Sequence, residues 1–216
     1  MPVFDPASAQ GNVLGGVWLI FIAGALFVAA FVYGLLIYAL AKWRKRGEGI
    51  PPQFKTNTFW EITGVIIPLL MVGGLFAVTL LGEYRVDAVE NKPYAVVDAG
   101  AFRWSWQFKY AGSGITVDGT PDSPPTLVLA VGKTTQIDLH SADVVHAFWI
   151  PAFLFKRDAT PGYTQHFDVT PTRTGTFEGK CVEFCGLDHA RMTFSVRVVS
   201  QAAYDRWVSS GGTAAL

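Results

Sequence analysis

Two long runs of uncharged residues limit what this chain can fold into. Residues 17–41 form 25 consecutive positions without a charge, and residues 62–81 form 20. As helices rising about 1.5 Å per residue, both would match the ~30 Å hydrocarbon thickness of a bilayer. The sequence therefore predicts two membrane-spanning helices. The alternative is a pair of buried helices in a soluble protein, although apolar runs there are typically about 10 to 14 residues long.

The charges between the two runs predict the orientation of this hairpin. Five basic residues lie there against two acids, whereas the 16 residues before the first run contain no Lys or Arg, which also fits a cleaved signal peptide poorly. By the positive-inside rule the connecting loop is cytoplasmic, and segment 1–16 and everything after Glu83 lie outside. We expect a transmembrane hairpin over residues 17–90, with helices at about 17–41 and 60–83, in a bacterial plasma membrane or an equivalent energy-transducing membrane. The basic residues are Lys42, Arg44, Lys45, Arg46 and Lys55, and the acids are Glu48 and Glu61.

After residue 90 the sequence changes to short strand-like segments. They fall at residues 94–98, 104–110, 126–131, 134–140, 165–169 and 193–199, and turns rich in Gly and Pro separate them. Several short strands at this spacing indicate an antiparallel sandwich or a Greek-key barrel. We therefore expect residues 91–216 to form an all-β domain outside the membrane, with a helix near residues 202–209 and a frayed end after it.

The charge balance excludes one class of partner. The chain has 17 basic and 17 acidic residues, and only 16% of its residues are charged, compared with roughly 25% in a typical soluble domain. Binding of nucleic acid needs a concentrated surface of Lys and Arg, because the phosphates must be neutralised. We therefore expect no nucleic-acid partner.

Four potential metal ligands crowd into one short segment near the C-terminus. Cys181, Cys185, His189 and Met192 follow one another at spacings of four, four and three in the segment KCVEFCGLDHARMTF. His146 lies 35 residues before Cys181, in the apolar segment VVHAFWIP. Thiolate, thioether and imidazole are the ligands that select copper, whereas carboxylates select calcium, magnesium or manganese. The set therefore favours a copper site.

Three other uses of the cysteines remain open. A disulfide between Cys181 and Cys185 is plausible in an exported domain, and a closed zinc site or two inert thiols are further alternatives. The joint presence of Met192 and His146 favours copper, because neither a disulfide nor a zinc finger calls for a thioether at this spacing. Two cysteines on one loop can bridge two copper ions, leaving each ion one histidine and one weaker ligand. Such a filled centre suits electron transfer rather than substrate chemistry.

Over nearly its whole length the chain resembles subunit II of haem-copper cytochrome c oxidases. The resemblance rests on the motifs CVEFCGLDHARM, ADVVHAFWIP, FKRDATPG and FRWSWQFKY, in the family's order behind a two-helix hairpin. It implies a cupredoxin-like Greek-key domain that holds a dinuclear copper A centre. The side-chain ligands that it implies are His146, Cys181, Cys185, His189 and Met192, and Glu183 would give its backbone carbonyl.

The same resemblance gives Glu183 a second role. Its carboxylate would help to hold a magnesium or manganese ion at the contact with the catalytic subunit, and hard cations of this kind prefer oxygen ligands. A solvated loop acid is the alternative. Asp158, in KRDATPG, would lie in a loop at that same contact, or would simply be a turn residue ahead of Pro161.

Electrons would enter the domain at Trp104. In RWSW, alternation places Trp104 and Trp106 on the same strand face, and the family pattern points to Trp104 as the exposed ring that the donor touches. Core packing is the alternative for aromatic residues in a strand. Asp143 would belong to an acidic rim that orients a basic cytochrome c, or would form a turn between strands.

Glu61 stands at the cytoplasmic start of the second run. An ionisable group near hydrocarbon is a functional candidate, and in the family pattern this glutamate lies at the entrance of a proton path into the catalytic subunit. Snorkelling of the side chain to the lipid headgroups is the alternative. The chain departs from the family pattern at Gly64, where Trp is usual, and at Phe102, where many members have a polar residue. His140 and His166 are interpreted as ordinary strand or surface residues.

The function implied by the resemblance is electron relay. The copper pair would take electrons from cytochrome c or from a cytochrome c domain of another complex. It would pass them to haem in a separate catalytic subunit I, accompanied by subunit III, where oxygen is reduced to water and protons are pumped. The chain has no CxxCH motif, so it carries no c-type haem of its own. The alternatives are the copper A subunit of a nitric oxide reductase and a membrane-anchored protein that binds or delivers copper.

Overall fold

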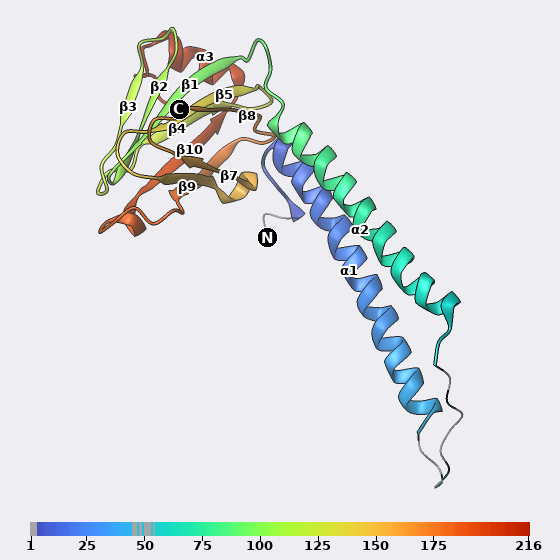
Figure 1. Cartoon of the computed structure of the whole chain (residues 1–216). Coiled ribbons are helices and arrows are strands. Elements are labelled where there is room, and N and C mark those ends of the chain that lie inside the picture. The colour runs from blue at the N-terminus through green and yellow to red at the C-terminus, as the bar shows by residue number, and fades with distance from the viewer. Residues whose placement is uncertain (1–3, 45–46, 48, 50–52, 54) are drawn as a thin grey trace. The chain divides into compact units, whose positions relative to one another are not determined.

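Figure 1 shows the computed structural model of the chain, which describes residues 4–44, 47, 49, 53 and 55–216. The chain divides into two compact units. One comprises Gly16–Glu83, and the other joins Met1–Gly15 to Tyr84–Leu216. Three of the charges that predict the orientation of the hairpin, Lys45, Arg46 and Glu48, lie outside the described residues.

Two long helices account for the uncharged runs. Helix α1 spans Ala9–Lys42 and helix α2 spans Thr58–Asp87, and both are long and apolar enough to cross a membrane. Pro68 lies inside α2 and does not end it, as expected where neighbouring groups can satisfy the freed carbonyl. Helix α1 begins eight residues before the apolar run because Ser8 caps it, its hydroxyl accepting a hydrogen bond from the backbone N–H of Gly11 at 2.9 Å.

The rest of the chain is a sandwich of two five-stranded sheets, which confirms the predicted fold class (Figure 1). The first sheet has the strand order β3-β2-β1-β5-β8 and the second β4-β10-β9-β6-β7. The strands are β1 Ala95–Phe102, β2 Ser105–Tyr110, β3 Thr116–Asp118, β4 Thr126–Ala130, β5 Thr135–Ser141, β6 His146–Ile150, β7 Phe155–Ala159, β8 Gln165–Val169, β9 Gly175–Cys181 and β10 Thr193–Val199. The expectation of purely antiparallel sheets is wrong, because β1 pairs with β5 and β4 pairs with β10 in parallel. The two strands of each parallel pair are far apart in the sequence, because parallel strands need a crossover connection between them.

Aromatic side chains from both sheets fill the core between them. Along β5 burial alternates at every residue, as expected for a strand with one face on the core. The rings of Phe148 and Phe194 stack with centroids 4.7 Å apart, and Trp106 packs edge-on against both. The Phe194 ring fits here because residue 179 of β9 is glycine. A Cβ atom on Gly179 would lie 2.2 Å from the Phe194 ring. This core extends to the end of the sandwich where His146 and Cys181 lie.

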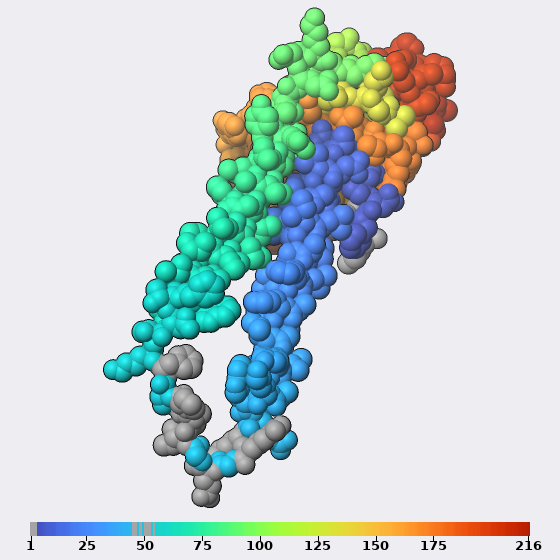
Figure 2. All heavy atoms as spheres, turned by 90° about the vertical axis from the view of Figure 1, so that its right-hand side faces the viewer, coloured from blue at the N-terminus to red at the C-terminus, as the bar shows by residue number. Residues whose placement is uncertain are grey.

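The residues before α1 belong to the β domain. Ala7 and Ser8 are buried, and the backbone of Ala7 hydrogen-bonds to Ala152 at 2.7 Å and to Thr172 at 3.0 Å. A Cβ atom on Gly11 would lie 2.6 Å from the carbonyl oxygen of Phe153, so only glycine allows this approach. Figure 2 shows the dark-blue N-terminal residues against the orange residues of the domain.

The C-terminal tail is ordered against the same domain, so the expected frayed end is wrong. Helix α3, Gln201–Ser209, is capped by Ser200 and buries Tyr204 and Trp207. After it, the N–H of Ala214 donates to the Ser210 hydroxyl at 2.9 Å, and Arg197 donates to the carbonyl oxygen of Leu216. The apolar side chain of Leu216 packs against the core, which gives the tail a fixed place that its polar sequence did not predict.

Candidate metal centre

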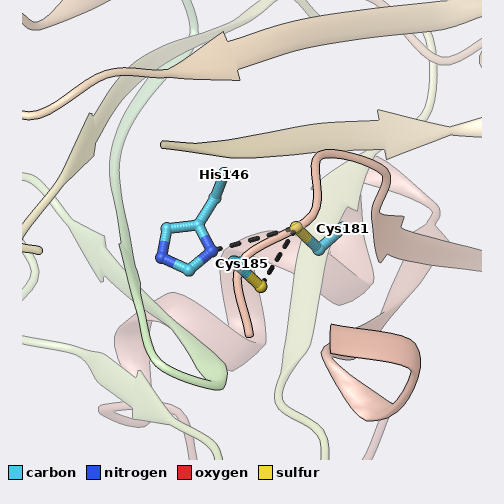
Figure 3. Close-up of side chains that lie close together, drawn as sticks. All are labelled: His146, Cys181 and Cys185. Atoms are coloured by element: carbon cyan, nitrogen blue, oxygen red, sulfur yellow. Dashed lines mark hydrogen bonds between the residues drawn. The ribbon is translucent and has the colours of Figure 1, made fainter. Parts of the chain in front are cut away.

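Five potential ligands meet at one end of the sandwich. His146 is the first residue of β6 and Cys181 is the last residue of β9, so the sheet itself places them side by side (Figure 3). Cys185 follows in the loop after β9, and His189 opens the short 3-10 helix η3, His189–Arg191. Met192 comes directly before β10. The loop between the paired strands β9 and β10 therefore brings Cys185, His189 and Met192 back to the end of the sandwich where His146 and Cys181 lie.

The two cysteines are free thiols, so the alternative of a disulfide is wrong for this structure. Their sulfur atoms lie 3.9 Å apart, far beyond the ~2.05 Å of a disulfide bond (Figure 3). Each sulfur faces a different imidazole: Cys181 lies 3.8 Å from Nδ1 of His146, and Cys185 lies 3.5 Å from Nδ1 of His189. The site thus consists of two thiol–imidazole pairs whose sulfur atoms lie next to each other without a bond.

Two weaker donors complete the site, one beside each sulfur. The thioether sulfur of Met192, which is fully buried, lies 3.8 Å from Cys185. The carbonyl oxygen of Glu183 accepts a hydrogen bond from the Cys181 thiol at 3.3 Å. The backbone N–H of Cys181 donates to the carbonyl of Met192 at 2.9 Å, which closes the base of the loop. The donors therefore divide into two sets of one imidazole and one weak ligand around a shared sulfur pair.

Asp143 fixes the orientation of His146. Its carboxylate contacts Nε2 of the buried imidazole at 2.8 Å, which leaves Nδ1 facing Cys181. The same carboxylate accepts hydrogen bonds from the backbone N–H groups of Arg103 at 2.8 Å and Val144 at 2.6 Å. Burial would raise the pKa of Asp143, but the hydrogen bonds from His146, Arg103 and Val144 outweigh it and lower the pKa to about 2. The sequence alone did not predict this contact, although Asp143 stands three residues before His146, in the turn that precedes β6.

The environment makes the two thiols unequal. Burial opposes ionisation of Cys181, but hydrogen bonds from His146 and from the backbone of Ala147 outweigh it and lower the pKa of this thiol. Burial and the neighbouring charge of Cys181 raise the pKa of Cys185. The environment therefore favours the thiolate at Cys181 over the thiolate at Cys185.

The donor set fits copper. The ligand atoms of His146, Cys181 and Cys185 all lie within 4.8 Å of one another, and they are the one such group of His, Cys and acidic side chains among the described residues. Two thiols, two imidazoles and a buried thioether form a soft set, whereas a structural zinc site would leave the thioether unused. The residues present therefore fit a copper site.

Trp104 touches this site, but not in the way that alternation predicts. It lies in the turn between β1 and β2, half-buried, and its indole N–H donates to the carbonyl oxygen of Cys185 at 3.1 Å. Trp106 lies within β2, is fully buried and packs edge-on against the His146 ring. The expectation that both rings share a strand face is wrong, because the strand begins only at Ser105.

Glu183 and Asp158 come together around one lysine. Nζ of Lys156 lies 3.3 Å from a carboxylate oxygen of Asp158 and 4.0 Å from one of Glu183. Asp158 belongs to strand β7, so the expected loop position and the alternative of a turn residue are both wrong. Both carboxylates are about half exposed, so oxygen ligands are accessible beside the Cys181 loop.

Glu61 and the two remaining histidines have local partners. The carboxylate of Glu61 accepts a hydrogen bond from the backbone N–H of Asn57 at 3.0 Å, at the start of α2. His140 pairs with Asp98 at 3.2 Å and His166 pairs with Asp138 at 2.7 Å on the outer face of the first sheet. The strand register brings these pairs together, and it could not be read from sequence spacing.

Comparison with known proteins agrees with this chemistry. A family model described as cytochrome c oxidase subunit II, periplasmic domain, matches residues 121–199. A probable cytochrome c oxidase subunit 2 of Streptomyces avermitilis is 35% identical over 95% of this chain and 76% of the relative. Cytochrome c oxidase subunit 2 of Corynebacterium glutamicum is 30% identical over 94% of this chain and 72% of the relative.

A solved structure extends the likeness to the fold. The crystal structure of the periplasmic domain of CoxB, subunit II of the cytochrome oxidase of Bradyrhizobium japonicum, is 31% identical with a TM-score of 0.52. The match covers 57% of this chain and 96% of that domain. Together with the relatives that match over nearly the whole length, these findings show that the chain belongs to the cytochrome c oxidase subunit 2 family.

Proposed function

We propose that this chain receives electrons from a cytochrome c and relays them through a dinuclear copper A centre to haem in the catalytic subunit of an oxidase. The observation that carries the proposal is the pair of unbonded sulfurs 3.9 Å apart, each facing its own imidazole. The proposed ligands are His146, Cys181, Cys185, His189 and Met192, with the carbonyl oxygen of Glu183. Copper bound in this way would supply one-electron storage shared between two ions.

The residues of this chain hold that centre in place. Asp143 keeps Nε2 of His146 occupied, so that Nδ1 stays directed at the sulfur of Cys181. The buried thioether of Met192 and the neighbouring core exclude water from the Cys185 side. When the ligands are already in place for the metal, their positions change little as the centre gains or loses an electron. A small rearrangement favours fast electron transfer.

We propose that electrons enter through Trp104. Its hydrogen bond to the carbonyl oxygen of Cys185 links a partly buried ring to the backbone of a proposed ligand. On the other side of the site, the Glu183 carboxylate would hold magnesium or manganese at the contact with subunit I, and Asp158 would lie beside it. The support is that both carboxylates lie within ion-pair distance of the same lysine, Lys156, and so lie near one another beside the Cys181 loop.

The proposed assembly places the chain in an energy-transducing membrane. Helices α1 and α2 would anchor it beside subunit I and subunit III, with the copper domain on the outer side, where cytochrome c binds. Glu61 would stand at the entrance of a proton path on the cytoplasmic side. Reduction of oxygen to water and proton pumping belong to the partner subunits, because this chain offers no haem ligands at recognisable spacing.

Copper loading of the full chain tests the proposal. We expect the detergent-solubilised protein to bind two copper ions and to show the electron spin resonance signal of one unpaired electron shared by both. The full chain is required, because residues before α1 form part of the copper domain. One copper ion with a blue-copper spectrum, or stoichiometric zinc in the protein from native membranes, would contradict the proposal.

Replacing Asp143 with alanine is expected to weaken copper binding by about 10- to 100-fold, because His146 loses the carboxylate that orients it. Asp143→Asn keeps an oxygen acceptor and should lose less. The measurement is a copper competition titration on the full chain. Asp98→Ala is the matched control, since it removes the carboxylate partner of His140 on the outer face of the other sheet. Unchanged affinity in Asp143→Ala would leave only a docking role for this residue.

A further inference from the structure

Asp168, in strand β8, is the one buried acidic residue in the described part of the chain, with 2% of its surface exposed. Its Oδ2 accepts a hydrogen bond from the backbone N–H of Glu90 at 2.7 Å. Its Oδ1 is buried and has no hydrogen-bond partner among the residues that the structure describes. None of the ion pairs among those residues includes Asp168 or Glu90. A buried carboxylate is costly unless a proton or a positive charge compensates it.

Asp168 lies on the outer face of the first sheet and not in the core. The ring of its neighbour Phe167 packs between the sheets against Phe148 and Phe155, so alternation directs Asp168 to the opposite face. The segment that follows α2 covers Asp168 there, because the backbone of Glu90 donates to it. The segment that buries this carboxylate therefore carries a second one.

Two threonine hydroxyls and an amide oxygen lie beside these carboxylates. The hydroxyl of Thr134 donates to Oε1 of Glu90 at 2.7 Å and lies 3.0 Å from the hydroxyl of Thr170, which stands two residues after Asp168. The side-chain oxygen of Gln10 accepts a hydrogen bond from the N–H of Thr170 at 3.1 Å. Oxygen atoms from separate segments of the chain therefore gather here, without sulfur and without a paired basic side chain.

The two carboxylates interact unfavourably. Burial raises the pKa of Asp168, the hydrogen bond from the N–H of Glu90 lowers it, and the negative charge of the Glu90 carboxylate raises it further, so the pKa lies above its ordinary value. Glu90 is exposed, so ions in the solvent can reach this pair. A bound cation would offset the cost of burial and the repulsion together. Oxygen donors alone suit a hard cation.

We propose that Asp168 and Glu90 bind a calcium ion, with Oδ1 of Asp168 and the Glu90 carboxylate as the charged ligands. Neutral oxygens of Thr170 and Gln10, together with water, would complete the coordination. Calcium accepts roughly six to eight oxygen ligands in a flexible geometry, which suits donors from separate segments, whereas magnesium demands a near-octahedral arrangement. Because Gln10 belongs to the first turn of α1 and Glu90 follows α2, the ion would tie the segments at both helix ends to the β domain.

This calcium site is separate from the metal centre and from the magnesium or manganese position proposed at Glu183. Thr134 directly precedes β5, whereas the turn that leads to His146 follows β5. The two sites therefore lie at opposite ends of that strand, and calcium binding can be measured without reference to copper.

Thermal unfolding of the full chain in detergent, followed by tryptophan fluorescence, tests the proposal. The protein is treated with a chelator and then titrated with calcium chloride at constant ionic strength. We expect the midpoint of unfolding to rise with calcium, because the ion binds the folded chain, with half of the effect at about 0.1 to 1 mM, as in extracellular calcium modules. Magnesium should need a concentration at least about tenfold higher. No shift at about 10 mM calcium would overturn the proposal and leave Asp168 protonated.

Three variants and a matched control locate the ion. Asp168→Asn keeps an oxygen acceptor for the N–H of Glu90 but removes the charge, and it should abolish the calcium effect. Glu90→Gln alters an exposed side chain, so the protein should still fold, and it should raise the calcium concentration for half of the effect by about tenfold. Asp98→Asn, which changes an acid on the outer face of the same sheet, and Glu183→Gln should both keep the full effect. Persistence of the effect in Asp168→Asn and Glu90→Gln, or its loss in Glu183→Gln, would overturn the proposal.

Discussion

Replacement of Cys185 by serine is expected to abolish the shared-electron copper signal completely. The Cys185 sulfur lies between three other donors, 3.9 Å from Cys181, 3.5 Å from His189 and 3.8 Å from Met192. A serine hydroxyl stays protonated at neutral pH, and it does not bridge copper as a thiolate does. With one thiolate left, we expect the variant to hold at most one copper ion. The readout is electron spin resonance together with the number of copper ions per chain.

Met192→Leu is the matched control for that variant, because it removes a sulfur from the same side of the site. Met192 is fully buried, and leucine fills a similar volume. As the weak ligand proposed above, the thioether would tune the reduction potential rather than join the two ions. We therefore expect Met192→Leu to retain two copper ions and a shifted potential. A shared-electron signal that persists in Cys185→Ser would contradict bridging by both sulfurs.

Replacement of Phe194 by alanine is expected to lower the free energy of unfolding of the copper domain by about 3 to 5 kcal/mol. Phe194 is 2% exposed and stacks on Phe148, and it also contacts Trp106 and Phe108. Removing the ring leaves a cavity between the sheets next to Gly179, whose missing side chain cannot fill it. Denaturant unfolding of the full chain in detergent, followed by tryptophan fluorescence, measures the change.

Phe184→Ala provides the control for Phe194→Ala with the same chemical change at an exposed position. Its ring is 80% exposed, so the free energy of unfolding should change by less than about 0.5 kcal/mol. A loss of stability in Phe184→Ala as large as in Phe194→Ala would mean that the effect does not come from burial between the sheets.

Hydrophobic periodicity predicted the elements whose pattern depends only on local sequence. The uncharged runs predicted both helices, and alternation predicted strands such as β5 and β10. It missed β6 and β9, which the metal centre needs most. β6 is a short, almost uniformly apolar segment without alternation, and β9 contains Gly179 because it lies directly against the Phe194 ring. Such strands are defined by what packs on them, and that information lies elsewhere in the chain.

The candidate site was predictable in its residue types and less so in its contacts. The spacing of Cys181, Cys185 and the following ligands predicted a shared site because a short loop can bring them together. The roles of Trp104 and Asp143 depended on three-dimensional detail. Trp104 lies in a turn and so escapes strand alternation, and Asp143 turns inward to His146 where an exposed acid was expected. Contacts between side chains and backbone groups of other elements could not be read from a one-dimensional pattern.

The buried residues before α1 have a consequence for biogenesis. Ser8 donates to the carbonyl oxygen of Phe153, so a segment that precedes both helices completes a structure whose other half follows 145 residues later in the chain. Two membrane spans are made in between, and both must be inserted before the two halves can meet on the same side of the bilayer. The domain therefore cannot complete its fold until both helices have been inserted into the membrane. Correct membrane topology is thus required before the metal centre can form.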